Sequence, residues 1–216
     1  MRLAELFGPQ IPTPKKKSAD TVPEVFIIES LELHEEEGWR EGAVLASVLK
    51  MCGKNPLYYY IRTKDELKLM ARKFAKSAYR YLHISCHGSE DSLHTTLDPV
   101  DYSEFAEIFE DRLKNRRLFV SACNAGTKMF AKAVHSTNPD IISIAAPIQS
   151  IGFDHAVAFW SAFYVKSFSL NSQSMKSGRV AEVLEPLAHL FGEPVHFSWK
   201  GKNGSLIHKI IDGEVS

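Results

Sequence analysis

The chain has 216 residues, 44% of them hydrophobic and 24% charged, which is typical of a globular protein with its own core. Lysine plus arginine equals aspartate plus glutamate, 26 each, so no net charge directs the chain to nucleic acid or to a membrane surface. Three cysteines without framework spacing argue against a disulfide scaffold, and no signal peptide or apolar run of about 18 residues is seen, so we expect a cytoplasmic protein.

The first 23 residues are rich in proline and contain three consecutive lysines, which predicts a flexible arm over residues 1–23. From residue 24 to residue 216 we expect a single domain in which short apolar runs alternate with helical periods. Strands are predicted at residues 25–31, 56–62, 79–85, 117–122 and 140–147. Helices are predicted at residues 35–53, after Thr63, and at 98–113, 127–136, 154–168 and 174–191.

Local patterns indicate how several of these helices begin and which side they bury. Thr63 and Glu66 have the spacing of a capping box, and Asp101 and Glu104 repeat that spacing before the next helix. The helix after Thr63 is expected to turn Leu67, Met70, Ala71 and Phe74 inward. The helix at 35–53 is expected to turn Trp39, Ala43, Val44, Val48 and Met51 inward and to end at Gly53.

The repeated strand–helix alternation predicts the fold class. Connections of helix length between strands imply parallel pairing with right-handed crossovers, hence an α/β sandwich around a mostly parallel sheet. Residues 195–211 differ, because two alternating strands flank Asn203-Gly204, which predicts a C-terminal β-hairpin. In such sheets chemistry gathers where the parallel strands end.

The stretch YLHISCHGSEDSLHTT, residues 81–96, places His83, Cys86, His87 and His94 close together in sequence. On an extended strand, His83 and His87 share a face but lie about 13 Å apart, at roughly 3.3 Å per residue. They are too far apart to share a zinc ion, and Cys86 points to the opposite face. We therefore expect no metal here, with His83 and Cys86 buried and His94 in a hairpin at residues 93–97.

His87 and Cys123 form the remaining pair. His87 ends the third predicted strand and is followed by Gly88, which permits a positive φ and a close backbone approach to a ligand. Cys123 follows the fourth strand and precedes the helix that begins near Thr127. If the two strands are neighbours in register, imidazole and thiol converge, and an imidazole or a helix N-terminus favours the reactive thiolate.

Three blocks then occur in order: HISCHG at 83–88, SACNAG at 121–126 and DHAVAFWSAFY at 154–164. They resemble the caspase-like (clan CD) cysteine peptidases, the group of caspases, metacaspases and separases, and within it the CHAT branch. The resemblance spans roughly residues 25–190. It implies a three-layer α/β/α sandwich with a central mostly parallel sheet, and a cysteine endopeptidase.

The resemblance also implies roles for residues of this chain. Cys123 is the expected nucleophile and His87 the general acid–base, with the backbone N–H groups of Gly88 and Cys123 at the oxyanion. Ser121 is expected to line the pocket for the P1 residue, the substrate residue before the scissile bond. Asp154 is either the N-cap of its helix or a substrate contact.

Three departures from the family pattern are visible. The caspase-type run Gln-Ala-Cys-x-Gly is absent, since Ser121 stands in place of the glutamine and the glycine comes later, at Gly126. Metacaspase-like relatives carry at the position of Ser121 an aspartate that receives an arginine or lysine side chain. That position therefore gives no support for a basic P1 residue. We also expect no helical repeats of the kind usual in CHAT proteins within residues 1–216.

The expected partners are a protein or peptide substrate and an activating protein, with no direct nucleic-acid or membrane contact and no cofactor. The resemblance suggests a bacterial defence (antiviral) or cell-death effector. Two other classes remain open. One is a catalytically silent caspase-like scaffold subunit. The other is a flavodoxin-like binding domain, which lacks support because GKNGS at 201–205 lies in the hairpin rather than between a strand and a helix.

Overall fold

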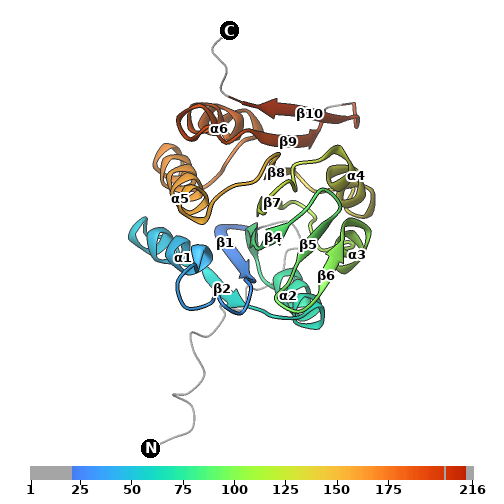
Figure 1. The fold of residues 1–216 in the computed structure, drawn as a ribbon. Coiled ribbons are helices and arrows are strands. Elements are labelled where there is room, and N and C mark those ends of the chain that lie inside the picture. The colour runs from blue at the N-terminus through green and yellow to red at the C-terminus, as the bar shows by residue number, and fades with distance from the viewer. Residues whose placement is uncertain (1–20, 202, 213–216) are drawn as a thin grey trace, which may run out of the picture.

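The computed structural model describes residues 21–201 and 203–212, which form two β-sheets and the helices that pack on them (Figure 1). The strands of the large sheet are β1 (Val22–Glu29), β2 (Leu57–Tyr60), β3 (Tyr79–Ser85), β7 (Arg117–Ser121), β8 (Ser143–Pro147), β9 (Val195–Lys200) and β10 (Leu206–Ile211). The small sheet contains β4 (His87–Gly88), β5 (Ser92–His94) and β6 (Pro99–Asp101). The helices are α1 (Glu41–Met51), α2 (Lys64–Lys76), α3 (Tyr102–Ile108), α4 (Lys128–Thr137), α5 (Phe153–Leu170) and α6 (Ser177–Phe191).

The large sheet has the strand order β10-β9-β8-β7-β3-β1-β2. The pairs β2–β1, β1–β3, β3–β7 and β7–β8 are parallel, and β9 and β10 continue the sheet in antiparallel pairs. The hairpin pairs Lys200 with Leu206, so its turn spans the predicted Asn203-Gly204. The predicted fold class, a mostly parallel sheet with a C-terminal hairpin, is confirmed.

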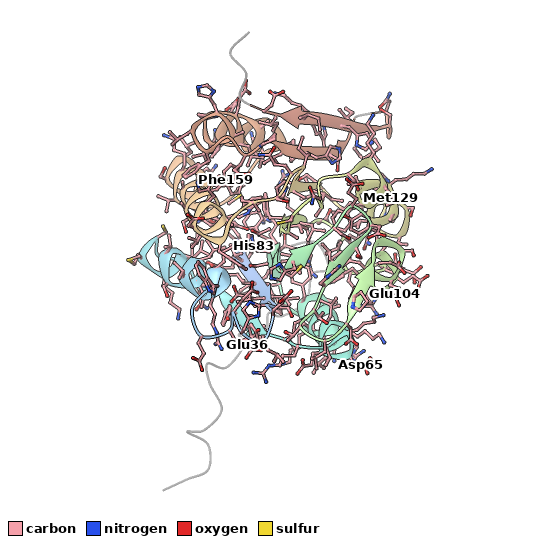
Figure 2. All side chains as sticks on the ribbon, in the orientation of Figure 1. Glu36, Asp65, His83, Glu104, Met129 and Phe159 are labelled. Carbon is pink, nitrogen blue, oxygen red and sulfur yellow. The ribbon has the colours of Figure 1, made fainter. Side chains whose placement is uncertain are left out.

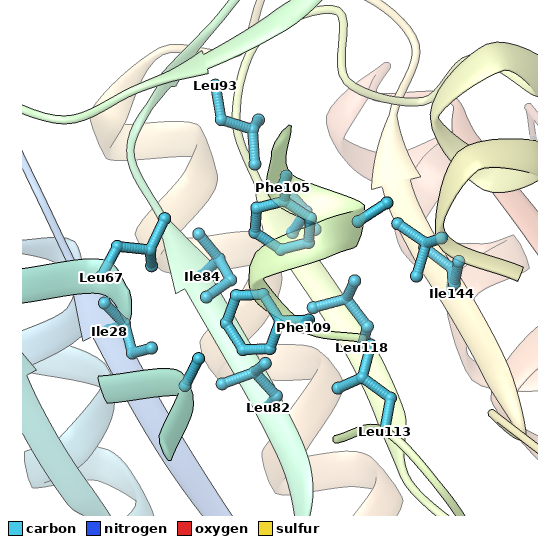
Figure 3. Close-up of a cluster of buried hydrophobic side chains, with 14 of the residues drawn as sticks. Ile28, Leu67, Leu82, Ile84, Leu93, Phe105, Phe109, Leu113, Leu118 and Ile144 are labelled. Atoms are coloured by element: carbon cyan, nitrogen blue, oxygen red, sulfur yellow. The ribbon is translucent and has the colours of Figure 1, made fainter. Parts of the chain in front are cut away.

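The parallel strands contribute side chains to two hydrophobic cores, one on each face of the sheet. Along β7, Leu118 and Val120 belong to one apolar cluster and Phe119 to the other, as expected from alternating side-chain directions. Helices α2, α3 and α4 cover the first cluster, part of which is drawn in Figure 3. Helices α1, α5 and α6 cover the second. The result is the expected three-layer α/β/α sandwich.

Two predicted helix starts are confirmed in detail. Thr63 accepts the Glu66 N–H at 3.2 Å while the Glu66 carboxylate accepts the Thr63 N–H, a reciprocal capping box that satisfies two otherwise orphaned N–H groups. Asp101 and Glu104 form the same arrangement before α3. The predicted inward side chains of α2 are also buried, namely Leu67, Met70, Ala71 and Phe74.

The prediction for residues 35–53 was wrong in two respects. The segment before Glu41 forms turns rather than helix, so α1 begins later. Its inward face is also different, since Val44 is 50% and Met51 80% exposed. The reason is Gly42, at which a Cβ would lie 3.0 Å from Ile27 Cγ2. Because this glycine packs against the sheet, α1 is rotated so that Leu45, Ala46 and Leu49 face inward.

Residues 1–20 of the predicted arm lie outside the described residues, whereas residues 22 and 23 already belong to β1. None of the helices found in residues 21–201 and 203–212 combines the length and apolar character needed to cross a lipid bilayer.

Candidate active site at the ends of β3 and β7

The ends of β3 and β7 bring His87 and Cys123 to the same edge of the sheet. These strands are parallel neighbours with Ser85 opposite Ser121, and the Cys86 N–H donates to the Ser121 carbonyl at 3.0 Å. His87 and Cys123 each follow the last paired residue by two positions, so they extend the same register. The assumption that these strands are adjacent and in register is confirmed.

Gly88 makes this proximity possible. A Cβ on Gly88 would lie 2.7 Å from the Cys123 carbonyl oxygen and 3.0 Å from Ala122 Cβ, which no side chain tolerates. Its φ is not positive, so the glycine is needed for close contact between two segments of the chain rather than for an unusual backbone conformation. Any larger residue here would push the histidine segment away from the cysteine segment.

The His87 ring is held from two sides. Its Nε2 lies 2.7 Å from Oε2 of Glu35, in the segment between β1 and α1. The Phe153 ring, at the start of α5, packs edge-on against the imidazole with centroids 5.6 Å apart. The Glu35 carboxylate also accepts the Glu32 N–H at 3.0 Å. Since a carboxylate only accepts, Nε2 carries the proton, which leaves Nδ1 as the ring nitrogen to exchange a proton with another group.

Cys123 sits in a tight turn between β7 and α4. Its sulfur accepts the Ile151 N–H at 3.4 Å, a contact with the loop that precedes α5. The following Asn124 has φ +57, and the N–H of Gly126 donates to the Pro147 carbonyl at 2.7 Å. A Cβ on Gly126 would lie 2.5 Å from the Ala146 carbonyl oxygen. The SACNAG run therefore forms a turn anchored to β8, with the thiol directed toward the α5 side.

The other members of the histidine-rich stretch have different surroundings. Cys86 packs against the cluster under α2–α4, and burial raises the pKa of its thiol to about 12, which keeps it protonated at neutral pH. His94 pairs with His87 across β4–β5, is exposed and lies 3.0 Å from the Ser92 hydroxyl. Within residues 21–201 and 203–212, no three histidine, cysteine, aspartate or glutamate side chains gather as metal ligands would.

His83 lies at the centre of the molecule (Figure 2) and is fully buried, as predicted. Its Nδ1 lies 3.3 Å from the Tyr164 hydroxyl, and the Trp160 ring packs against the imidazole edge-on. Its Nε2 faces Oε1 of Glu41 at 3.5 Å, and neither of these two atoms has a hydrogen-bond partner among the described residues.

The Glu41 carboxylate links β3 and β7, the two strands that lead to His87 and Cys123. The hydroxyls of Ser85 in β3 and Ser121 in β7 each donate to its Oε2 at 2.9 Å. Because side chains alternate along a strand, Ser85 shares a face with His87, and Ser121 shares the same face with Cys123. The Glu41 carboxylate, which is 3% exposed, therefore lies on the same face of the sheet as His87 and Cys123. It contacts the strands two residues before these side chains.

A second buried carboxylate at the end of β1 is fully hydrogen-bonded, unlike that of Glu41. The oxygens of Glu29 accept the Gly42 N–H at 2.6 Å and the Tyr58 hydroxyl at 2.7 Å. Burial raises the pKa of Glu29, more than its hydrogen bonds lower it. Both oxygens of Glu29 thus accept hydrogen bonds, whereas Oε1 of Glu41 accepts none from the described residues.

Ser121 and Asp154 occupy places that the sequence did not indicate. Ser121 is buried, and its hydroxyl donates to the Glu41 carboxylate. Its side chain is therefore not exposed to line a substrate pocket directly. Asp154 is not the N-cap of α5, because the helix begins one residue earlier, at Phe153, with Gly152 as its cap. The reason is that residues 148–152 are held by the neighbouring segments, which carries the chain into the helix sooner. Asp154 is exposed in the first turn.

Two open pockets lie near His87. One, of about 200 Å³, lies between α1 and α5 and is lined by Trp39, Glu41, Val44, Phe153, Asp154 and Val157. It adjoins His87 through Phe153, whose other neighbour is the Trp39 ring at 5.6 Å. The other pocket, of about 330 Å³, is lined by His87 itself with residues of the β5–β6 region and Leu31.

Sequence reasoning missed Glu35 and Glu41. Both were assigned to a continuous helix, in which they would have lain on a solvated face. The one local hint was Gly38, which directly follows the three glutamates at 35–37 and favours a turn over a helix. Nothing local indicated that these carboxylates reach His87 and Ser121, because those contacts span 52 and 80 positions of the chain.

Comparison with known proteins supports the fold. No protein-family model and no curated protein matches the chain. Among solved structures, it is similar to the crystal structure of caspase-1 from Spodoptera frugiperda. The identity is 14%, the match covers 84% of this chain and 85% of that chain, and the TM-score is 0.53. The chain thus has a caspase-like α/β/α fold, and the comparison does not distinguish the CHAT branch from the others.

Proposed function

We propose that this chain is a cysteine endopeptidase with Cys123 as nucleophile and His87 as general acid–base. The observation that supports it most is the in-register pairing of β3 with β7, from which the imidazole and the thiol emerge at adjacent strand ends. Glu35 adds a third group, since its carboxylate holds Nε2 of His87 and leaves Nδ1 for the thiol. The caspase-like fold agrees with this reaction class.

In the proposed reaction, His87 takes the thiol proton and the Cys123 thiolate adds to the scissile carbonyl carbon. The carbonyl oxygen becomes an oxyanion, which the N–H groups of Gly88 and Cys123 are proposed to bind, each donor being worth about 3–4 kcal/mol in comparable sites. His87 then protonates the leaving amine, and the C–N bond breaks. Water, deprotonated by His87, attacks the thioester and releases the acid and the thiol.

The proposed substrate is an extended segment of a protein. The two open pockets near His87 offer room for side chains of a peptide that lies across the dyad. On the strength of the three sequence blocks, we extend the proposal to the CHAT branch and to a cytoplasmic, partner-activated effector in bacterial defence or cell death.

The test compares wild type with Cys123→Ala and His87→Ala on a peptide library, with cleavage read by mass spectrometry and alkylation of Cys123 by iodoacetamide read in parallel. We expect cleavage to be lost in both variants while circular dichroism is unchanged. Cys52→Ala is the matched control, because Cys52 lies past the end of α1, outside the site, and should leave both readouts unchanged.

Two outcomes contradict the proposal. If Cys86→Ala abolishes alkylation and Cys123→Ala does not, the nucleophile is misassigned. If the folded wild-type protein cleaves no peptide and leaves a covalent peptide-mimic inhibitor unreacted, the chain is better described as a silent caspase-like scaffold.

A further inference from the structure

At the edge of the large sheet opposite the dyad, Arg117 is a buried cation that has only neutral partners. It is the first residue of β7, about 13 Å from Ser121 at roughly 3.3 Å per residue, and its side chain is 3% exposed. Burial lowers the pKa of its guanidinium to about 10, which still leaves the group charged at neutral pH. No carboxylate of the described residues forms an ion pair with it, so its charge is uncompensated there.

The hydrogen bonding of this guanidinium is also incomplete. Its Nη1 donates to the hydroxyls of Ser143 at 2.6 Å and Ser177 at 3.2 Å. Its Nε is enclosed and has no partner within residues 21–201 and 203–212, and its Nη2 donates to none of these residues either. A buried guanidinium normally has both acceptors and a counter-charge, because leaving it unpaired is costly. An oxyanion next to Nη2 supplies both.

The guanidinium of Arg117 is directed at the N-terminus of α6, since Ser177 is the first residue of that helix. The N–H of Val180 donates to the Lys176 carbonyl at 2.9 Å, so the first three N–H groups of the helix precede its hydrogen-bond ladder. The N-cap residue Lys176 makes no side-chain cap hydrogen bond. Gly178 is exposed, and a Cβ built on it meets no atom within 4 Å. The first turn of α6 therefore offers N–H donors and open space beside a buried cation.

Further cations surround the loop at 171–176 that leads into α6. Nη1 of Arg80 and Nζ of Lys54 donate to backbone carbonyls of this loop at 2.9 and 2.6 Å. Neither side chain forms an ion pair with a carboxylate of the described residues; Glu24, which lies near Lys54, instead accepts the Asn55 N–H at 2.7 Å. Positive charge thus exceeds negative charge around the start of α6, which attracts an anion to it.

From this arrangement we propose that Arg117 and the first turn of α6 form a binding site for a phosphate group, either free or carried by a small molecule. Nη2 of Arg117 and the N–H groups of the turn donate to the phosphate oxygens, and the helix dipole favours their charge. A phosphate suits the site better than a carboxylate, because it has enough oxygens to accept from the guanidinium and from several N–H groups at once. The site is separate from the dyad, so the inference does not depend on the proposed peptidase function.

The experiment is isothermal titration calorimetry of the full chain with sodium phosphate and, separately, with adenosine 5′-monophosphate. The ionic strength is held constant with sodium chloride, so that general screening does not change during the titration. We expect saturable binding of one phosphate group per chain, with a Kd below about 1 mM for the better of the two ligands. Tighter binding of the nucleotide identifies a phosphate monoester as the ligand, and tighter binding of inorganic phosphate identifies the free ion.

Two variants test the two halves of the site. Arg117→Gln should weaken binding by about tenfold or more, since it removes a charge-assisted hydrogen bond. Gly178→Glu should weaken it similarly, because its carboxylate competes for the same helix end, whereas Gly178→Gln adds equal bulk without charge and should stay within about twofold of wild type. Lys132→Gln is the control for net charge, because Lys132 is exposed on α4, at the other face of the sheet.

Three results would overturn the proposal. The first is no saturable binding of either ligand to the folded wild-type protein at concentrations up to about 10 mM. The second is equal affinity in Gly178→Glu and Gly178→Gln, and the third is equal affinity in Arg117→Gln and wild type. If Arg117→Gln does not fold, the comparison of Gly178→Glu with Gly178→Gln decides, because that position is exposed and both side chains have room there.

Discussion

Glu35 and Glu41 flank the same turn between β1 and α1, yet each makes different contacts near the dyad. Glu35 reaches His87 from a partly open position, with its side chain 12% exposed. Glu41 is enclosed and binds two serines of the sheet. One carboxylate thus contacts the imidazole of the proposed dyad, and the other links the two strands that lead to it. Both depend on single side chains, so single substitutions test them.

We predict that Glu35 acts as a positioning residue for His87. Glu35→Ala removes the acceptor at Nε2 and frees the ring to rotate, so kcat should fall by about 10–100-fold with little change in KM. Glu35→Gln keeps an acceptor oxygen and should recover part of the rate. Steady-state kinetics on one peptide substrate measure both effects.

Glu37→Ala is the matched control for this prediction, because Glu37 is an exposed glutamate in the same turn region. A loss in KM alone, or an equal loss in Glu35→Ala and Glu37→Ala, would mean that Glu35 does not orient the catalytic ring.

At the scale of elements, α4 and the hairpin β9–β10 enclose a group of histidines. His135 of α4 lies 3.3 Å from the Ser198 hydroxyl of β9, and the His196 and His208 rings stack across the hairpin. Burial lowers the pKa of His135 and of His196 to about 4, with nearby cationic groups adding to the shift. These elements therefore pack best when the histidines are neutral.

This packing predicts an acid-sensitive fold. The unfolded chain protonates His135 and His196 near pH 6.5, but the folded protein only near pH 4, so the unfolded state binds more protons within that window. The free energy of unfolding should therefore fall as the pH is lowered, by about 1–2 kcal/mol per histidine between pH 7 and pH 5. Urea denaturation followed by circular dichroism measures this loss.

His196→Gln should reduce the loss, because glutamine does not titrate. His34→Gln serves as the control, since the His34 side chain is 76% exposed. If His196→Gln and wild type lose equal stability on acidification, the buried histidines do not govern the acid response.

At the scale of the whole molecule, the sheet separates two cores, and the dyad lies where the parallel strands emerge from between them. The core under α1, α5 and α6 is strongly aromatic: the Phe119 ring lies 5.0 Å from that of Phe163 and 5.9 Å from that of Trp160. Phe119 is fully buried on β7, the strand that leads to Cys123. Packing of this core therefore also fixes the strand that ends next to Cys123, the proposed nucleophile.

We predict that Phe119→Ala lowers the free energy of unfolding by about 3–5 kcal/mol, because it leaves a cavity among these rings. Chemical denaturation measures the change. Leu190→Ala, at a side chain 72% exposed on α6, should change it by no more than about 0.5 kcal/mol. Similar values for the two variants would show that the α1–α5–α6 layer is not the stabilising core inferred from burial.

Much of the fold was predictable because its causes are local. Strand–helix alternation, the capping boxes at Thr63 and Asp101, and the Asn203-Gly204 turn act over a few residues, so short windows of sequence carry them. The pairing of His87 with Cys123 was also within reach, because parallel neighbours necessarily end at one edge of the sheet. The amino-acid order alone thus specifies the layers and the edge of the sheet at which His87 and Cys123 meet.

The inward face of α1, the hydrogen bond from His87 to Glu35 and the link from Ser121 to Glu41 were decided by the tertiary structure alone. Each depends on how the segment between β1 and α1 folds back over the sheet, which the close contact of Gly42 with Ile27 constrains. Contacts between residues far apart in sequence leave no periodic pattern, because their geometry exists only once the layers have packed. The reaction class could therefore be proposed from the sequence, but the carboxylates that contact His87 and Ser121 could not be predicted.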